Sequence, residues 1–332
     1  MSQSYAWGSY LDLIAMADSS ITLRGVNKSF GSTHAVRKLD LDVPRGSLCG
    51  FLGPNGAGKT TTIRMIMSII YPDSGSIEVL GGNALKSKDR IGYLPEERGL
   101  YRKMRVGEFL QYLTKLKGVR RRDITTYIQQ WLERIDLPDV YRKKCEELSK
   151  GMQQKVQFLA AILHEPELLI LDEPFSGLDP VNTKLLNQLI RELQGHGTTI
   201  IFSTHVLHQA ELICDRIFLI NKGEKILDAT LEEIRQRFDP RTIVAEPVDG
   251  EVLSDGIAGV QAVRRLPHSA AFELELESSA DPQVIMQRIL SQRPMRSVEL
   301  RRLSLDEVFI QVVQNDVGSG AAELAREELS HV

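Results

Sequence analysis

The chain is poor in cysteine and lacks any long hydrophobic run, and each shortage excludes a class of protein. Its three cysteines lie far apart in apolar surroundings, without the spacing of a metal site: Cys49, Cys145 and Cys214. Such thiols are typical of buried structural positions in a reducing compartment. No apolar run reaches the roughly 18 residues that a membrane-spanning helix needs, and the nearest, residues 63–71, contains Arg64 and Ser68. We therefore expect a cytoplasmic chain that does not itself cross a membrane.

The chain also has no large excess of positive or negative charge, since 41 basic and 44 acidic residues leave a net charge of -3. This balance gives no support for a general nucleic-acid or membrane-surface role. The N-terminus also lacks the basic segment that opens a secretory signal. Strand-like alternation begins only at Ile21, so we interpret residues 1–19 as an N-terminal extension. Two hypotheses remain for it: translation starts at Met16, or the extension is a short disordered segment.

The remaining composition is that of a soluble globular protein, with 42% hydrophobic and 26% charged residues. A length of 332 residues suits one large domain and a smaller one, and Asp239-Pro240 marks a boundary between them. We predict a large domain at 20–238 with a helical subdomain at about 102–160, an accessory domain at 241–315 and a polar tail at 316–332.

Hydrophobic periodicity in the large domain predicts an α/β fold. The expected elements are paired strands at 21–43, short apolar strands at 47–52, 77–80, 168–171 and 199–202, and helices at 60–70 and 185–193. Their β-α-β order predicts a parallel sheet core. Between about 102 and 145 the apolar residues instead recur at helical spacing: Phe109, Leu110, Leu113 and Leu116, then Ile124, Ile128, Leu132 and Ile135. This stretch is predicted to be a helical insert.

The C-terminal part has the pattern of a small α+β domain. Phe272, Leu274 and Leu276 alternate as in a half-buried strand, and Val298 with Leu300 indicates another. Asp281-Pro282 is predicted to open a helix with Val284, Ile285, Ile289 and Leu290 on one face. Capping-box patterns at Thr230–Glu233 and Ser304–Glu307 predict two further helix starts.

The segment that follows the strand at 47–52 fits the phosphate-binding pattern G-x-x-x-x-G-K-[ST]. Its backbone N–H groups and the positive end of the next helix attract phosphate, Lys59 is placed to reach the β- and γ-phosphates, and Thr60 offers a hydroxyl to Mg²⁺. The expected nucleotide-binding residues are Gly53, Pro54, Asn55, Gly56, Ala57, Gly58, Lys59, Thr60 and Thr61. A chance glycine-rich turn is the alternative, which the flanking strand and helix disfavour.

Two acids and one histidine end apolar strands farther along the chain. Asp172 suits the Mg²⁺ shell, and Glu173 suits a general base that orients the attacking water. His205 ends the run at 199–204, where a neutral imidazole can hydrogen-bond the γ-phosphate. The alternatives are a helix-capping acid pair and a structural histidine. We predict Glu173 and His205 as catalytic residues, and the other histidines, His34 among them, as structural.

Two further signals are weak when taken alone. Leu148–Met152 precedes a helical run and can present the Ser149 hydroxyl and the Gly151 amide to phosphate, although an ordinary helix start has the same pattern. Phe30 can stack on an adenine ring, although a lone phenylalanine is more often part of a core.

In combination and in this order, these residues resemble the nucleotide-binding subunit of an ATP-binding cassette (ABC) transporter. The resemblance covers residues 20–238 and implies a P-loop NTPase fold with a mixed sheet core, an antiparallel β subdomain and a helical subdomain. It implies that Phe30 is the A-loop aromatic, that Leu148–Met152 is the signature loop acting on ATP of the opposite subunit, and that Ser176–Asp179 is the D-loop. Asp179 thereby joins the nucleotide-binding residues.

The chain departs from the family pattern at the Q-loop, where Glu96 replaces glutamine. A carboxylate can still ligate Mg²⁺ and adds negative charge near ATP, so the predicted metal ligands are Thr60, Glu96 and Asp172. The signature loop has Lys150 and Met152 where many members have glycine and glutamine. It retains the phosphate-facing pair Ser149 and Gly151, so we expect a working site.

Within the family, the chain is similar to the separate ATPase subunits of ABC-2-type exporters, such as sodium-efflux and drug exporters. The resemblance implies ATP and Mg²⁺ as cofactors, an ATP-sandwich dimer with a second copy, and a separate ABC-2 permease that holds the chain on the cytoplasmic face of the membrane. No nucleic acid is expected as a partner. The alternative is a soluble ABC ATPase that acts on ribosomes or nucleic acid, but such proteins typically carry two cassettes or a long coiled-coil insertion.

Overall fold

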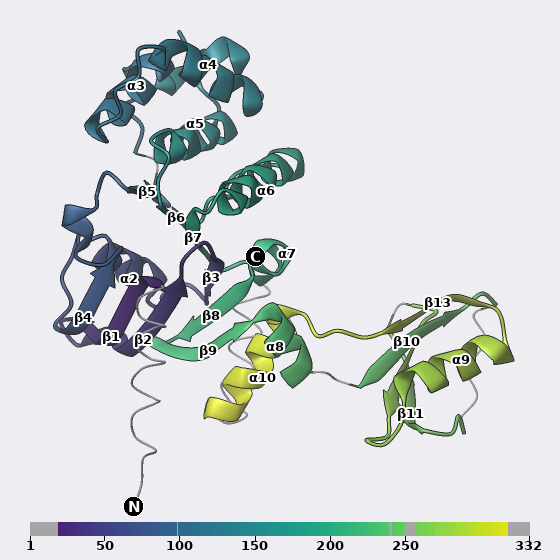
Figure 1. Cartoon of the computed structure of the whole chain (residues 1–332). Helices are drawn as coiled ribbons and strands as arrows, with labels where there is room; N and C mark the ends of the chain where they lie inside the picture. The colour runs from purple at the N-terminus through teal and green to yellow at the C-terminus, as the bar shows by residue number, and fades with distance from the viewer. Residues whose placement is uncertain (1–18, 98, 239–240, 250–255, 268, 318–332) are drawn as a thin grey trace, which may run out of the picture. The chain divides into compact units, whose positions relative to one another are not determined.

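The computed structural model describes residues 19–97, 99–238, 241–249, 256–267 and 269–317, which form two compact units (Figure 1). The second unit comprises Leu231–Gln311, and the first comprises the remaining described residues. The predicted extension before Ser19, the boundary at Asp239-Pro240 and the tail from residue 318 lie outside the described residues. No helix in the part of the chain that is described has the length and apolarity to span a membrane.

A six-stranded mixed sheet forms the centre of the first unit. In spatial order it contains β5 (Ile91–Leu94), β6 (Leu168–Asp172), β7 (Thr199–Thr204), β3 (Leu48–Leu52), β8 (Arg216–Asn221) and β9 (Glu224–Thr230). Neighbouring strands from β5 to β8 are parallel, and β9 pairs antiparallel with β8. β3, β6 and β7 are buried along their whole length, which explains their continuous apolar sequences. The three predicted core strands are therefore confirmed as neighbours.

The first part of the chain forms a three-stranded antiparallel sheet. In spatial order it contains β2 (Thr33–Pro44), β1 (Ser19–Phe30) and β4 (Ser74–Val79). Leu23 and Leu41 of this sheet share one buried cluster with Phe51 of β3, Ile63 and Phe218. The antiparallel sheet and the mixed sheet therefore enclose a common core around the first helix.

The helices of the first unit are α2 (Lys59–Ile66), α3 (Val106–Leu116), α4 (Ile124–Arg134), α5 (Lys150–Ile162), α6 (Pro180–Gly195) and α7 (Leu207–Ile213). The predicted helix at 60–70 is too long, because Ser68 has a left-handed backbone with φ 55° soon after α2 ends. The helical insert is confirmed by α3 and α4. Leu116, at the end of α3, is 62% exposed and does not share the buried face of Phe109 and Leu110.

The second unit contains a four-stranded antiparallel sheet with the order β11 (Val260–Arg265), β12 (Phe272–Leu276), β10 (Thr242–Pro247) and β13 (Met295–Leu300). Its helices are α8 (Leu231–Arg237), α9 (Pro282–Gln292) and α10 (Leu305–Val317), the last of which extends beyond the unit. The predicted capping box is present at α10, where Ser304 N–H donates to Glu307 Oε2 at 2.9 Å.

The predicted apolar face of α9 is only half right. Ile285 and Ile289 are buried against the sheet, whereas Val284 and Leu290 are 42% and 55% exposed. Successive helical residues point about 100° apart, so a residue adjacent to Ile285 or Ile289 is turned toward solvent.

Candidate functional site

The phosphate-binding loop connects β3, in the interior of the mixed sheet, to the start of α2. Two of its glycines are required by close backbone approach. A Cβ on Gly53 would lie 2.1 Å from the Ile220 carbonyl oxygen, and a Cβ on Gly58 would lie 2.4 Å from the Ala35 oxygen. Both glycines also have positive φ, at 153° and 105°, a backbone conformation that residues with a side chain rarely adopt. The same Ala35 oxygen would lie 2.8 Å from a Cβ on Gly223, so three segments converge on one carbonyl.

Lys59 is the first residue of α2 and is 7% exposed. Its Nζ donates to the Gly53 oxygen at 2.7 Å and to the Pro54 oxygen at 3.1 Å. Burial lowers the pKa of Lys59, and the negative charges of Glu173, Asp172 and Glu96 oppose that shift. The ammonium group is therefore held against the loop with three carboxylates around it.

Asp172 ends β6 and is 1% exposed. Burial raises the pKa of its carboxyl group, and the hydroxyls of Ser203 and Thr60 oppose the shift without completing a hydrogen bond to either oxygen. A buried carboxylate with two unpaired oxygens is costly unless a cation is present. Asp172 and the Thr60 hydroxyl supply the oxygen ligands that Mg²⁺ prefers, so these residues fit that ion.

Asp172 and Thr60 do not form a complete metal site by themselves. Among the described residues, no group of three or more His, Cys, Asp or Glu side chains is arranged to hold a metal ion. Mg²⁺ typically takes one or two carboxylates together with substrate phosphates. The arrangement therefore suits a cation whose remaining ligands come from a bound nucleotide and water.

Glu173 is tied to the end of β7. Its Oε1 accepts from the His205 backbone N–H at 2.9 Å and lies 2.7 Å from His205 Nδ1, and its Oε2 accepts from Thr204 Oγ1 at 3.0 Å. Its backbone is left-handed, with φ 48°. Such a conformation in a non-glycine residue stores strain of about 1–3 kcal/mol, which the surrounding contacts must offset. The glutamate and histidine predicted as catalytic are thus in direct contact.

One cavity of about 530 Å³ collects most of the predicted phosphate, metal and acid residues. The predicted residues that line it are Asn55, Gly56, Gly58, Lys59, Thr60, Thr61, Glu96, Asp172 and Glu173. The predicted residues that are not among its lining are Phe30, Gly53, Pro54, Ala57, Ser149, Gly151, Asp179 and His205. The phosphate-binding half of the predicted site is thereby assembled, and the signature half lies elsewhere.

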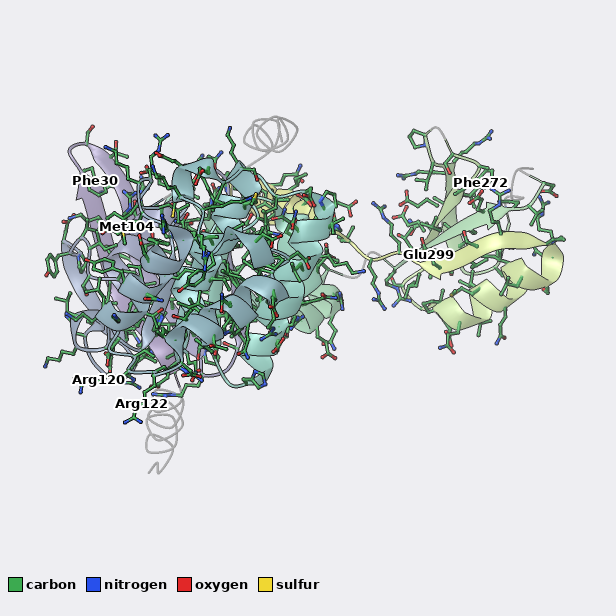
Figure 2. The ribbon with its side chains drawn as sticks, turned by 90° about the horizontal axis from the view of Figure 1, so that it is seen from above. Phe30, Met104, Arg120, Arg122, Phe272 and Glu299 are labelled. Atoms are coloured by element: carbon green, nitrogen blue, oxygen red, sulfur yellow. The ribbon has the colours of Figure 1, made fainter. Side chains whose placement is uncertain are left out.

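The signature and D-loop residues form a second local group. Ser149 caps α5, and its Oγ accepts from the Met152 N–H at 3.3 Å. A Cβ on Gly151 would lie 3.7 Å from the Gly177 oxygen, so the two loops are neighbours. Asp179 caps α6 by accepting from the Asn182 N–H at 2.9 Å. Phe30 is 52% exposed with Lys28 Nζ 5.4 Å from its ring centre (Figure 2).

Sequence reasoning missed the other residues that line the cavity: Ser32, Thr33, His34, Ala35, Arg37 and Lys222. His34, predicted as structural, lines this cavity. The first five residues follow Phe30 closely in β2 and its turn, which is the one signal in the sequence that pointed to them. Lys222 has no such signal, because the turn between β8 and β9 brings it to the loop.

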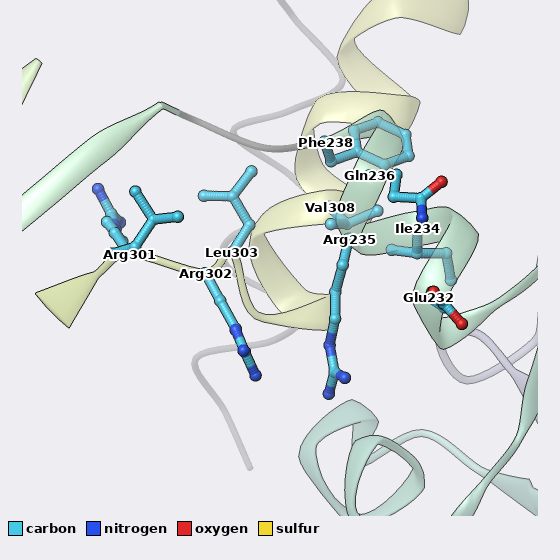
Figure 3. Close-up of a pocket in the computed structure, with 10 residues that line it drawn as sticks. Glu232, Ile234, Arg235, Gln236, Phe238, Arg301, Arg302, Leu303 and Val308 are labelled. Carbon is cyan, nitrogen blue, oxygen red and sulfur yellow. The ribbon is translucent and has the colours of Figure 1, made fainter. Parts of the chain in front are cut away.

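A second cavity, of about 440 Å³, lies within the second unit (Figure 3). Ile234, Leu303 and Val308 contribute apolar lining, and Arg235 and Arg302 extend in the same direction from it. Both arginines are exposed, and neither forms an ion pair or hydrogen bond with the described residues. These charges are hydrated, so this cavity contains no buried charge that requires a ligand.

Comparison with known proteins agrees with this geometry. The family model for "ABC transporter" matches residues 36–176, and the model "ATP-binding protein DrrA1-3-like, C-terminal domain" matches residues 230–313. The uncharacterised ABC transporter ATP-binding protein YhaQ of Bacillus subtilis is 40% identical over 294 residues, which cover 88% of this chain and 98% of that protein. The daunorubicin resistance ATP-binding protein DrrA3 of Streptomyces coeruleorubidus is 34% identical over 330 residues, which cover 91% of this chain and 98% of that protein.

The solved structures show the same fold. A dimeric ABC transporter cassette superposes with a TM-score of 0.60 at 23% identity, covering 64% of this chain and 98% of that structure.

Proposed function

This chain belongs to the ATP-binding proteins of ABC transporters, and on that premise we propose that it drives export through a separate ABC-2-type permease. It is the ATP-hydrolysing subunit of a membrane transporter, as the family and its relatives show. The single observation that carries the proposal is the cavity in which Lys59, Asp172 and Glu173 meet. The DrrA-like C-terminal domain supports the exporter assignment, because the relative DrrA3 is a daunorubicin resistance protein.

The division of the site supports action as a pair of identical copies. The phosphate-binding half lines one cavity, while Ser149 and Gly151 are absent from that lining. Val181, two residues after Asp179 and in the first turn of α6, is 76% exposed and is available for contact with a second copy. In the proposed dimer, the signature residues of each copy complete the nucleotide site of the other.

The residues around the cavity have distinct proposed roles. Lys59 binds the β- and γ-phosphates, and the glycine-rich loop surrounds them with backbone N–H groups. Mg²⁺ bound by Thr60, Asp172 and Glu96 would neutralise charge on the phosphate oxygens. Glu173 accepts a proton from the attacking water, and His205 holds the Glu173 carboxylate in place. Phe30 stacks on the adenine ring.

An exposed aromatic patch in the helical insert supports docking to the permease. Tyr101 and Tyr112 are 52% and 43% exposed, and their ring centres lie 6.0 Å apart. Met104, which Figure 2 labels, comes three residues after Tyr101 in the sequence, and Leu116 adds exposed apolar surface at the end of α3. We place the permease contact here, which would hold the chain at the cytoplasmic face of the membrane.

Glu173→Gln tests the catalytic role. Loss of a general base typically lowers the rate about 10²- to 10⁴-fold, and we expect ATP hydrolysis to fall at least 100-fold while ATP binding persists. Sedimentation with Mg²⁺ and ATP should then show a stable dimer, and Lys59→Ala, which loses its phosphate contact, should show none. Normal hydrolysis by Glu173→Gln would refute this mechanism.

Capture from native membranes tests the partner. Tagged Glu173→Gln protein, held with Mg²⁺ and ATP in mild detergent, should retain a multi-span membrane protein at a near one-to-one ratio by mass spectrometry. The Lys59→Ala protein is the matched control for nucleotide-dependent capture. Recovery of ribosomes or DNA-bound proteins would instead favour the soluble ABC ATPase.

A further inference from the structure

We propose that Glu96 makes this site select ATP that carries a divalent cation and reject metal-free ATP. The inference rests on the proposed ATP-binding function of the cavity and assigns a specificity-determining role to one residue in it. Glu96 follows β5, is exposed, and lines the same cavity as Lys59 and Asp172.

Glu96 adds a negative charge to the lining of the cavity. Three carboxylates, from Glu96, Asp172 and Glu173, act on the ammonium group of Lys59. Glu96 also contributes to the raised pKa of Asp172, after the larger effect of burial, so its charge is felt at the proposed cation site. With glutamine at this position, one of the three negative charges would be absent.

The Asp172 carboxylate has no hydrogen-bond partner of its own, so a bound cation would give it a partner. Both Asp172 oxygens lack hydrogen-bond partners, and the described residues contain no preformed cluster that would hold a metal ion without nucleotide. A cation bound to the phosphates therefore serves two functions at once. It neutralises the nucleotide, and it gives Asp172 and Glu96 a positive partner.

The size of the effect follows from the charge of the ligand. Fully ionised ATP carries about four negative charges, and its complex with Mg²⁺ carries about two. At a separation of roughly 6 Å in a water-like dielectric, repulsion of two additional charges by one carboxylate corresponds to about a tenfold difference in affinity. A neutral glutamine amide supplies no such discrimination.

The test compares wild-type protein with Glu96→Gln and Glu97→Gln by isothermal titration calorimetry. Each protein is titrated with ATP in excess EDTA and with ATP in excess MgCl₂ at equal ionic strength. Glu97 is the matched control, because it is the adjacent exposed acid, its substitution removes the same charge, and it does not line the cavity.

We expect Glu96→Gln to bind metal-free ATP about tenfold more tightly and to bind Mg-ATP within about threefold of wild type. Glu97→Gln should change both affinities by less than about threefold. An unchanged ratio of the two affinities in Glu96→Gln overturns the inference, as does an equal change in Glu97→Gln, which would indicate a general charge effect.

The calorimetry also separates this inference from the proposed function. Wild-type protein that binds ATP in neither solution would refute the nucleotide site and the inference together. Wild-type protein that binds Mg-ATP, with a ratio insensitive to Glu96, would refute only the selectivity.

Discussion

The cavity at the phosphate-binding loop and the cavity of the second unit differ in the burial of their charged side chains. In the first unit, Asp172 is 1% exposed and unpaired, and Lys59 is 7% exposed and surrounded by acids. In the second unit, Arg235 and Arg302 extend from an apolar surface into water (Figure 3). A hydrated charge costs the folded protein little free energy, whereas a buried unpaired charge carries a large desolvation cost. Burial without a partner therefore marks the first cavity as the place where a ligand supplies what the protein lacks.

The mixed sheet of the first unit and the four-stranded sheet of the second unit also differ in burial. β6 is buried along its whole length, whereas β12 alternates between buried and partly exposed residues. The small sheet is thus packed on one face, and its other face carries ion pairs such as Arg301 with Glu273 and Arg264 with Glu275. A one-sided core concentrates stability in a few large side chains.

The largest effect is expected from Phe272→Ala in the second unit. Phe272 is 2% exposed within the single buried cluster of this sheet (Figure 2), and its removal should cost about 3–5 kcal/mol of unfolding free energy in that unit. Hydrogen exchange of β10 to β13 should rise accordingly, with ATP binding retained. Val284→Ala, on the exposed side of α9, is the control and should change stability by about 0.5 kcal/mol or less. A parallel loss of ATP binding would show that the units do not unfold separately.

A smaller effect of opposite sign is expected from Asp172→Asn. Because burial raises the pKa of Asp172 in the folded state, the ionised form destabilises the protein above the ordinary pKa of an aspartate. The asparagine protein should therefore be more stable at neutral pH, and the gain should disappear as pH falls through the raised pKa into the ordinary range. Urea unfolding at several pH values measures this.

Mg-ATP should reverse that order. The wild-type protein should gain more stability than Asp172→Asn from Mg²⁺ and ATP, because a charged carboxylate binds the cation more strongly than a neutral amide does. Equal stabilisation of the two proteins in urea would contradict a cation role for Asp172.

The smallest effect separates two adjacent arginines. Arg301 pairs with both Glu273 and Glu307, joining β12 to the start of α10, whereas Arg302 has no acidic partner among the described residues. Arg301→Ala should lower the unfolding free energy of the second unit by up to about 1 kcal/mol, and Arg302→Ala should leave it within about 0.5 kcal/mol. Thermal unfolding of the two variants in low and high salt tests this, since only the Arg301 effect should shrink with salt.

Much of the phosphate-binding half was predictable because its residues are contiguous or end strongly apolar strands. The loop from Gly53 and the strand ending at Asp172 are examples. β5, β8 and β9 were not predicted, because short apolar runs do not distinguish a buried strand from a buried helix. The contribution of Lys222 depends on the pairing of β8 with β9, which no local pattern contains.

The conformation of Glu173 could not be predicted from the sequence either. Its type and position predicted a base, but its contact with His205 depends on the register of β6 beside β7, which places Asp172 opposite Ser203. Side-chain identity can be read from a motif, whereas the partner of a catalytic side chain is decided by strand pairing.

The convergence of three segments on the Ala35 carbonyl has a consequence for mutational tolerance. Gly58 belongs to the nucleotide motif, whereas Gly223 belongs to a hairpin turn far along the chain, yet a Cβ on either would press on the same oxygen. A single methyl group in that turn would displace the first residues of β2, which line the cavity, and through them the phosphate loop itself. Substitution of Gly223 is therefore limited by the Ala35 carbonyl oxygen, and this hairpin turn is under the same steric limit as the phosphate-binding loop.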